Sequence, residues 1–214
     1  NGIWPQSLMM ERADDIRRAE FPPAGFWRRW AGDAPAAKLP ADDDSETART
    51  RAEIASAVER VAAEVAATSS DDLLVVSVLK GSFVFAADLI RALHRAGVAP
   101  EVEFITLSSY GAGTVGGEVR ILRDIESDVR GRQVLLVDDI LESGRTLKYA
   151  RDLMLERGAA RAEIAVLLDK RMRRKSEIEA DHIGFDCPDY FVVGYGMDVG
   201  HAFRELPFVG RVVE

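Results

Sequence analysis

The sequence contains few cysteine and histidine residues. Cys187 is the only cysteine among 214 residues, so an internal disulfide is excluded, and no other metal ligand lies near it in the sequence. We therefore expect a reduced core thiol, as in cytosolic proteins. The three histidines lack the spacing of a metal site, and a structural or surface role is expected for His94, His182 and His201.

Long apolar runs and an excess of positive charge are also missing. No stretch approaches the ~18 residues that span a bilayer, and no basic leader precedes an apolar segment. Lysine and arginine number 28 against 36 aspartates and glutamates, which gives a net charge of -8. Because like charges repel, general binding to nucleic acid or to an anionic membrane is not expected. The sequence therefore predicts a cytoplasmic protein with neither of these partners.

The first 46 residues differ in composition from the rest. They hold five of the eight prolines, all three tryptophans and the acidic run 42–44. We expect an N-terminal arm over 1–46 that is poorly ordered; the alternative is that its tryptophans dock on a neighbouring subunit. A single domain is expected over 47–214.

Hydrophobic periodicity predicts an α/β domain. Apolar residues from Ile54 to Val65 recur at helical spacing, and 73–79 is a continuous apolar run typical of a strand buried on both faces. Further strands are expected at 102–110, 118–122, 134–138, 163–168 and 190–195, and further helices at 83–95 and 146–157. Buried strands that alternate with helices indicate a mostly parallel central sheet flanked by helices.

The segment 134–146 contains the strongest chemical signal. A buried strand is expected to end on Asp138 and Asp139, and a small hydroxyl-rich turn then leads into a helix. Ligands of parallel sheets bind beyond the carboxyl ends of the strands, and N–H groups at a helix start bind phosphate. Two carboxylates beside such a turn suit a sugar phosphate. The structural alternative is a strand-end turn with a helix cap.

Three other motifs are weaker. The run 111–116 matches the dinucleotide pattern G-x-G-x-x-G, but a strand-like stretch follows it where a helix is needed. The stretch 142–146 lacks the lysine of a phosphate-binding Walker loop. The basic run 170–175 is typical of a solvated face; the alternative is an RNA contact.

Several motifs together resemble a known family. The stretch 134–146 is similar to the ribose-phosphate signature of type I phosphoribosyltransferases. The surrounding blocks are similar to those of hypoxanthine-guanine (6-oxopurine) phosphoribosyltransferases: "VLKGSFVFAADLIRAL" (78–93), "SSYG" (108–111), "LLDKR" (167–171), "ADHIGFDCPDYFVVGYGMD" (180–198) and "FRELPFVG" (203–210). The similarity runs in family order from about residue 50 to about residue 210, and it does not cover 1–46.

The resemblance implies a fold and a reaction. The fold is a mostly parallel sheet flanked by helices, with a small hood formed by chain-terminal segments. The reaction transfers the 5-phosphoribosyl group of phosphoribosyl pyrophosphate to hypoxanthine or guanine, giving IMP or GMP and pyrophosphate in the presence of Mg²⁺. The family further implies a homodimer or homotetramer, a cis peptide bond at Leu79–Lys80 and a mobile catalytic loop over 108–121.

The same resemblance assigns the phosphoribosyl pyrophosphate contacts. The ribose hydroxyls are implied to bind Asp138 and Asp139. The 5′-phosphate is implied to bind Ser143, Gly144, Arg145 and Thr146. The pyrophosphate and the loop that closes over it are assigned to Lys80, Gly81, Arg204, Ser108 and Tyr110. The Mg²⁺ ligands are expected to be Asp198, Asp138 and Asp139.

The purine contacts and the catalytic groups are also implied by the family. Lys170 would donate to the exocyclic oxygen, Phe191 would stack on the ring, and Val192 with Asp198 would read the other edge. Glu142 is the expected base, with Lys170 as the second catalytic residue. Taken singly, each residue has an ordinary structural alternative: Phe191 and Val192 as strand core, Lys170 and Arg204 as surface cations, Asp198 as a turn residue and Glu142 as a helix cap.

Two positions depart from the family pattern. Glu142 stands where the family commonly has aspartate, and Val199 stands where an aromatic residue commonly follows the aspartate matching Asp198. A xanthine-preferring phosphoribosyltransferase and a regulatory RNA-binding protein on the same fold are therefore kept as alternatives. The basic run 170–175 would be the RNA contact of the second alternative.

Overall fold

A computed structural model describes residues 47–109 and 119–212. The expected arm at 1–46, Tyr110 and most of the expected catalytic loop lie outside the described residues, and the predictions about them stay predictions. Among the described residues, no helix is both long enough and apolar enough to cross a membrane.

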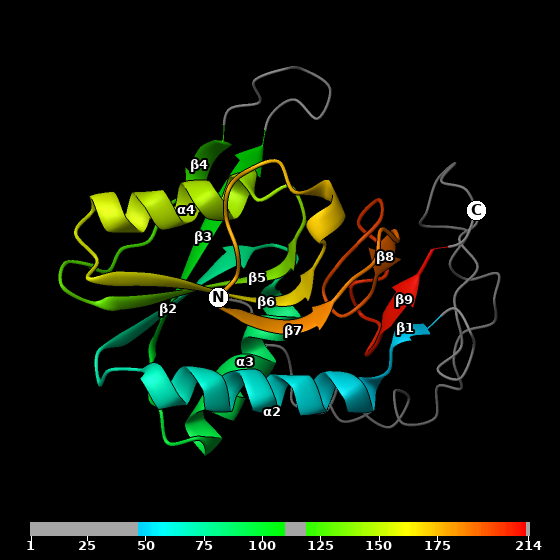
Figure 1. The fold of residues 1–214 in the computed structure, drawn as a ribbon, viewed down its shortest axis with the longest axis horizontal. Coiled ribbons are helices and arrows are strands. Elements are labelled where there is room, and N and C mark those ends of the chain that lie inside the picture. Colours follow the sequence, from blue (N-terminus) through cyan, green and yellow to red (C-terminus); the bar gives the residue numbers. More distant parts are fainter. Residues whose placement is uncertain (1–46, 110–118, 213–214) are drawn as a thin grey trace, which may run out of the picture. The chain divides into compact units, whose positions relative to one another are not determined.

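A six-stranded sheet forms the centre of the described fold (Figure 1). Its strands lie in the order β4-β3-β2-β5-β6-β7, and all neighbouring pairs are parallel except β3 with β4. Their bounds are β2 Leu73–Leu79, β3 Glu101–Ser109, β4 Val119–Arg123, β5 Gln133–Leu141, β6 Arg161–Asp169 and β7 His182–Asp186. The mostly parallel α/β sheet expected from the sequence is confirmed.

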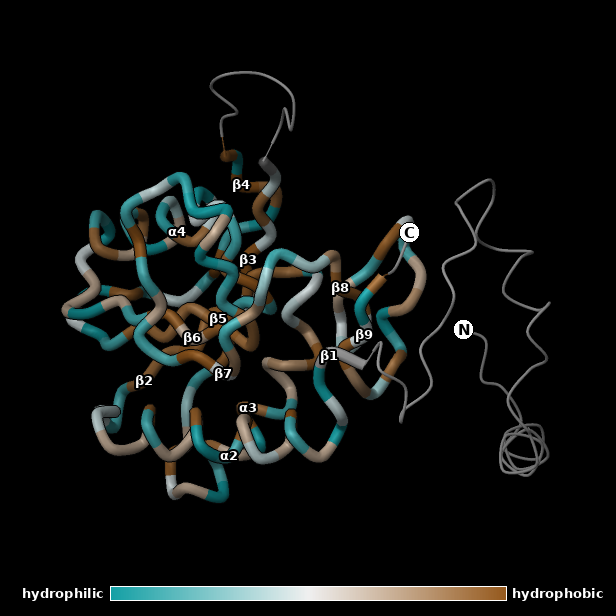
Figure 2. The backbone as a smooth tube through the Cα atoms, turned by 45° about the vertical axis from the view of Figure 1, so that its right-hand side comes forward, coloured by the Kyte–Doolittle hydropathy of each residue, from teal (hydrophilic) through white to brown (hydrophobic). Residues whose placement is uncertain are grey.

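Helices cover both faces of this sheet. Helices α2 (Arg51–Thr68) and α3 (Phe83–Arg95) lie on one face, and α4 (Arg145–Glu156) lies on the other (Figure 1). Successive residues of a strand point to opposite faces, so β5 sends Leu135 and Val137 into one core and Leu136 into the other. Figure 2 shows the resulting hydrophobic centre between polar helix surfaces.

The bounds of α2, β2 and α3 can be explained by residues close to them in the sequence. Thr50 and Glu53 form a reciprocal capping box at the start of α2, which satisfies N–H groups that the helix itself leaves free. The apolar run 73–79 and the helical pattern 83–95 coincide with the bounds of β2 and α3. Both predictions are confirmed, because a continuous apolar run bounded by a turn is typical of a buried strand and apolar residues at helical spacing are typical of a helix.

Strand β5 is longer than the sequence pattern suggested. The expected end at residue 138 was wrong, because the strand continues to Leu141. Its pairing with β2 stops at Ser77 opposite Val137, whereas its pairing with β6 continues until Leu141 lies opposite Asp169. The two aspartates at 138 and 139 therefore lie inside the strand, at the point where it loses one neighbour.

A second, three-stranded sheet forms the hood, composed of β1 (Thr47–Arg49), β9 (Val209–Arg211) and β8 (Val192–Val193) in that order. The sequence predicted a strand over 190–195 beside the other buried strands. This was wrong in length and place, since only two residues pair and they belong to the hood. Gly194 then turns the chain at a φ of +94°, which ends the strand.

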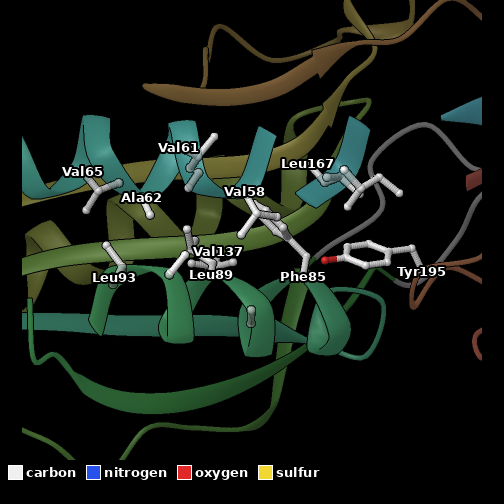
Figure 3. Packing of buried hydrophobic residues seen from close by; sticks show 14 of the residues in the cluster. Val58, Val61, Ala62, Val65, Phe85, Leu89, Leu93, Val137, Leu167 and Tyr195 are labelled. Carbon is white, nitrogen blue, oxygen red and sulfur yellow. The ribbon is translucent and has the colours of Figure 1, made fainter. Parts of the chain in front are cut away.

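The hood shares the core beneath helices α2 and α3. Val192, Tyr195 and Val209 belong to the same buried cluster as Phe85 of α3. Figure 3 shows Tyr195 beside Phe85 in this cluster. The small hood expected from the sequence is thus present, and it is attached to the main sheet through shared apolar packing.

Candidate active site

The carboxyl ends of three neighbouring strands meet in register. Leu141 of β5 pairs with Asp169 of β6, which pairs with Asp186 of β7. The ladder continues past the strand ends, because Lys170 N donates to Leu141 O and Cys187 N donates to Asp169 O, both at 2.9 Å. Residues that follow these strands are consequently held side by side.

Asp138 and Asp139 lie against the backbone of the β2–α3 connection. A Cβ placed on Gly81 would lie 1.9 Å from Asp139 Oδ2, so this close approach depends on glycine. The Asp138 carboxylate also accepts a local hydrogen bond, from the backbone N–H of Asp139 to Asp138 Oδ1 at 3.0 Å. Lys80 precedes this contact, and the Leu79–Lys80 bond is cis, as the resemblance predicted.

Both aspartates are electrostatically perturbed. The surrounding protein displaces water from the carboxylates, and this desolvation raises the pKa of Asp138 and of Asp139. Repulsion from Asp139 raises the pKa of Asp138 further, whereas nearby Arg204 acts to lower that of Asp139. The pair is thus suited to bind a cation or hydroxyl donors, which would compensate the unfavourable negative charge.

The hood contacts the same connection through Gly196. This residue has a φ of +100°, and a Cβ on it would lie 2.2 Å from the carbonyl oxygen of Gly81. Arg204 holds the Gly196 turn, because its Nη1 donates to Gly196 O at 2.6 Å and its Nη2 lies 2.6 Å from Asp198 Oδ1. Arg204 and Asp198 are therefore brought together beside Gly81, paired with each other.

The turn at 143–146 leaves the start of α4 without a side-chain cap. Gly144 is the N-cap residue at a φ of +80° and has no side chain to cap the helix as Thr50 does for α2; the one side-chain bond described there is a long one, from Arg145 N to Ser143 Oγ at 3.5 Å. A Cβ on Gly144 would lie 2.6 Å from Ile178 Cγ2, and Ser143 O accepts bonds from Lys175 N and Ser176 N. This firmly held turn presents helix N–H groups that suit a phosphate.

Glu142 and Lys170 face each other. Lys170 is only 5% exposed, and its Nζ lies 3.0 Å from Glu142 Oε1. Lys170 is therefore not a surface cation, and Glu142 does not cap α4. Arg174 holds the backbone at Glu142 against β6. Its Nε donates to Glu142 O at 3.1 Å, and its guanidinium pairs with buried Asp169.

The basic run 170–175 is partly neutralised by carboxylates. Lys170 pairs with Glu142, Arg171 and Arg174 pair with Asp169, and Arg173 pairs with Asp189. The sequence alone missed these partners, because each acidic residue comes from another segment or precedes the run. These pairs set three carboxylates against the five basic residues of the run, so it presents less free positive charge to an RNA than its composition suggests.

The purine-side residues differ in burial. Phe191 is 55% exposed, so it is not strand core, whereas Val192 is buried in β8. The backbone at Phe191 is fixed because its carbonyl oxygen accepts a bond from Val212 N at 2.8 Å. Ser108 lies near the end of β3, and its buried Oγ has no hydrogen-bond partner among the described residues.

The described carboxylates provide few ligands for a metal. Over residues 47–109 and 119–212, no three His, Cys, Asp or Glu side chains group as a complete metal site. Mg²⁺ does not need such a cage, because it usually takes one or two carboxylates together with water and substrate phosphate oxygens. The pair Asp138–Asp139, destabilised by its own negative charge, fits this mode of binding.

Comparisons with known proteins agree with this architecture. The family model of the phosphoribosyl transferase domain matches residues 49–199. Hypoxanthine phosphoribosyltransferase of Escherichia coli K12 is 44% identical over 146 residues, covering 68% of this chain and 80% of the relative. Hypoxanthine-guanine phosphoribosyltransferase of Dictyostelium discoideum is 41% identical over 146 residues, covering 68% and 81%.

Solved structures give the same result. A hypoxanthine phosphoribosyltransferase from Staphylococcus aureus has a TM-score of 0.72 and 37% identity, covering 80% of this chain and 94% of its own. A variant of such an enzyme in which an invariant aspartic acid is replaced by glutamic acid has a TM-score of 0.74, with 37% identity and coverage of 79% and 95%. Together with the sheet, the hood and the paired carboxylates within β5, these matches establish that the chain belongs to the phosphoribosyltransferase family.

Proposed function

We propose that this protein transfers the 5-phosphoribosyl group from phosphoribosyl pyrophosphate to hypoxanthine or guanine, giving IMP or GMP and pyrophosphate. The observation that carries the proposal is the pairing of buried Lys170 with Glu142, close in sequence to the paired aspartates and to the uncapped start of α4. A cation and a carboxylate at one site suit a purine that carries an exocyclic oxygen and loses a ring proton. The names of the relatives support the same activity.

Different residues of the chain bind the sugar, the phosphate groups and the ring proton of the purine. Asp138 and Asp139 hold the ribose hydroxyls, and the turn 143–146 holds the 5′-phosphate. In the reaction, a purine nitrogen bonds to the anomeric carbon as the bond to pyrophosphate breaks, and Glu142 accepts the ring proton. Positive charge develops on the sugar, and the nearby carboxylates stabilise it. Lys80, Gly81 and Arg204 bind the departing pyrophosphate; Ser108 and Tyr110 contribute from the loop.

The purine is read by residues after β6 and in the hood. Lys170 donates to the exocyclic oxygen, Phe191 offers its exposed ring for stacking, and Val192 and Asp198 meet the opposite edge. Asp138 with Asp139, or Asp198, would each supply one or two carboxylates to Mg²⁺, since the three do not group as one site among the described residues, and the ion would neutralise pyrophosphate charge. Since Asp198 pairs with Arg204 at 2.6 Å, metal binding at Asp198 would compete with that ion pair.

Product formation tests the proposal directly. Purified protein is incubated with phosphoribosyl pyrophosphate and Mg²⁺, and hypoxanthine, guanine, xanthine and adenine are offered in turn. We expect IMP and GMP; xanthosine monophosphate as the main product would favour the xanthine alternative. No nucleotide from any base, with a salt-sensitive shift of RNA in a binding assay, would favour the regulatory alternative. The homodimer or homotetramer and the cytoplasmic location stay predictions.

A further inference from the structure

Four side chains of alternating charge form a closed ring on the purine side of the site. This charge ring consists of Glu142, Lys170, Arg173 and Asp189. Lys170 Nζ lies 3.0 Å from Glu142 Oε1 and 3.7 Å from Asp189 Oδ1. Arg173 Nε lies 2.5 Å from Asp189 Oδ1 and 3.8 Å from Glu142 Oε1. Each cation therefore has both carboxylates as neighbours, and each carboxylate has both cations.

The backbone under the charge ring is held at several points. Lys170 N donates to Leu141 O, which fixes the start of its loop beside Glu142. Asp189 lies in a tight turn after β7, where Tyr190 N donates to Pro188 O at 2.7 Å. Two strand ends and this turn thus bring the four charges together, although they come from separate segments of the chain.

Lys170 needs a second anionic partner if Glu142 acts as a base. Once Glu142 accepts the ring proton, it becomes neutral and attracts the ammonium group less strongly. Asp189 takes no part in this proton transfer, and its Oδ1 lies 3.7 Å from Lys170 Nζ. Arg173 pairs with Asp189 at the shorter distance, so Asp189 is itself held in place and does not draw Lys170 away from the purine.

We propose that Asp189 is a positioning residue, which acts with Arg173 to hold the Lys170 ammonium group for the exocyclic oxygen of the purine. This inference rests on the proposed function. It assigns a task to two residues that contact neither the phosphoribosyl group nor the proposed metal. It also assigns a role to Arg173, in the middle of the basic run 170–175.

The variant Asp189→Asn tests the inference, because it preserves the size of the side chain and removes its charge. We expect the KM for hypoxanthine to rise about ten-fold while the KM for phosphoribosyl pyrophosphate changes less than about two-fold. The matched control is Asp186→Asn, the same substitution at the end of β7. Asp186 has an 82% exposed side chain and lies outside the charge ring, so both constants should stay near those of the natural protein.

A double variant separates positioning from simple structural damage. Arg173→Gln alone leaves Asp189 free to attract Lys170, and Asp189→Asn alone leaves Arg173 free to attract Glu142. Removing both charges restores neutrality, so the double variant should lose less than the sum of the two single effects. Equal rises of both KM values in Asp189→Asn, or strict additivity in the double variant, would overturn the proposal.

A crystal structure of Asp189→Asn provides a readout that does not depend on turnover. We expect Lys170 Nζ to leave its position between the two carboxylates; an unchanged lysine would overturn the inference even if activity were altered. Failure of the natural protein to form any nucleotide would reject the proposed function. In that case the crystal structure would still decide whether Asp189 positions Lys170.

Discussion

Asp138 illustrates how a single residue can be costly to the fold and useful to a ligand. Its pKa is raised by desolvation and by Asp139, so the folded protein holds a proton on this carboxyl more tightly than the unfolded chain does. Stability is therefore lost as pH rises from the ordinary aspartate range through the raised pKa. The ionised form of the pair is unfavourable in the folded protein, and a bound cation would relieve this cost.

The substitution Asp138→Asn should accordingly stabilise the free protein while it abolishes most activity. Asparagine keeps an oxygen for Asp139 N and removes the charge. We expect a higher Tm at pH 7.5, by about 2–4 °C for each kcal/mol gained, and a gain that disappears near pH 4. Thermal scans across this pH range measure it. Asp71→Asn, an exposed control, should change Tm little, and a pH-independent gain at position 138 would contradict the electrostatic cause.

Glu142 should behave as a base that contacts Lys170. Glu142→Gln keeps the size and an acceptor oxygen but cannot take a proton, so kcat should fall by about 10²–10⁴. Affinity for phosphoribosyl pyrophosphate should be nearly unchanged, and the Tm should fall only modestly, because no cap on α4 is lost and glutamine still offers buried Lys170 an acceptor oxygen without the charge. Steady-state kinetics and a thermal scan measure both.

The matched variant at this position is Glu142→Asp. It restores the residue that the family commonly has and should retain much of the activity. Near-normal turnover of Glu142→Gln would mean that the proton goes to another group or to water.

At the scale of elements, the close contact between the β2–α3 connection and β5 should be sensitive to one methyl group. In Gly81→Ala the new Cβ would meet the Asp139 carboxylate, 1.9 Å from Oδ2 and 2.6 Å from Cγ. The carboxylate must then move, and a shift of about 1 Å can cost about 10²-fold in rate. We expect such a loss of kcat/KM in the nucleotide-forming assay.

Gly97→Ala is the control for a general glycine effect. Its Cβ meets nothing within 4 Å, although its φ of +88° disfavours alanine. It should lower stability by about 1 kcal/mol and leave activity intact. Equal kcat/KM values for Gly81→Ala and Gly97→Ala would show that the Asp139 carboxylate can move without loss of activity.

Elements with an unambiguous pattern were predictable from the sequence, and elements that depend on distant partners were not. The bounds of β2 and α3 follow from a continuous apolar run and a helical repeat. By contrast, β5 continues through two aspartates because β6 still pairs with it there. Strands β1 and β9 have three residues each and are strands only because β1 pairs with β9 and β9 pairs with β8.

The candidate site was predictable in its motifs but not in its pairings. The paired aspartates of β5 and the turn 143–146 form local patterns that can be read along the chain. The charge ring joins residues from three separate segments. The spacing of residues along the sequence therefore indicated only the basic run 170–175 and not its acidic partners. The pairing of Arg204 with Asp198 was missed for the same reason, since each had been assigned separately to a ligand.

At the scale of the whole molecule, one part-buried hydroxyl ties the hood to helix α3, which covers the main sheet. Tyr195 OH donates to Asp88 Oδ2 of α3 at 2.5 Å, and burial together with Asp88 raises the pKa of Tyr195, so the donor keeps its proton. Tyr195→Phe should cost about 1.5–3 kcal/mol in the free energy of unfolding. Hydrogen exchange should increase in the hood turn that contains Gly196.

The control for this substitution is Tyr190→Phe. The ring of Tyr190 contacts the Arg211 guanidinium at 4.1 Å, a contact that phenylalanine preserves. Stability should therefore change little at position 190. Identical thermal scans for both variants would show that the Tyr195 hydroxyl contributes nothing to hood attachment.

The pairing of β1 with β9 has a consequence for the order in which the protein assembles on the ribosome. Thr47 lies opposite Gly210, so β1 has no partner until β9, more than 150 residues later in the sequence, has been synthesised. The six strands of the main sheet and their helices emerge earlier and can pack beforehand. A nascent chain would thus contain the turn 143–146 and the main sheet before the hood, so the hood residues, including those proposed to contact the purine, would reach their final positions after the main sheet.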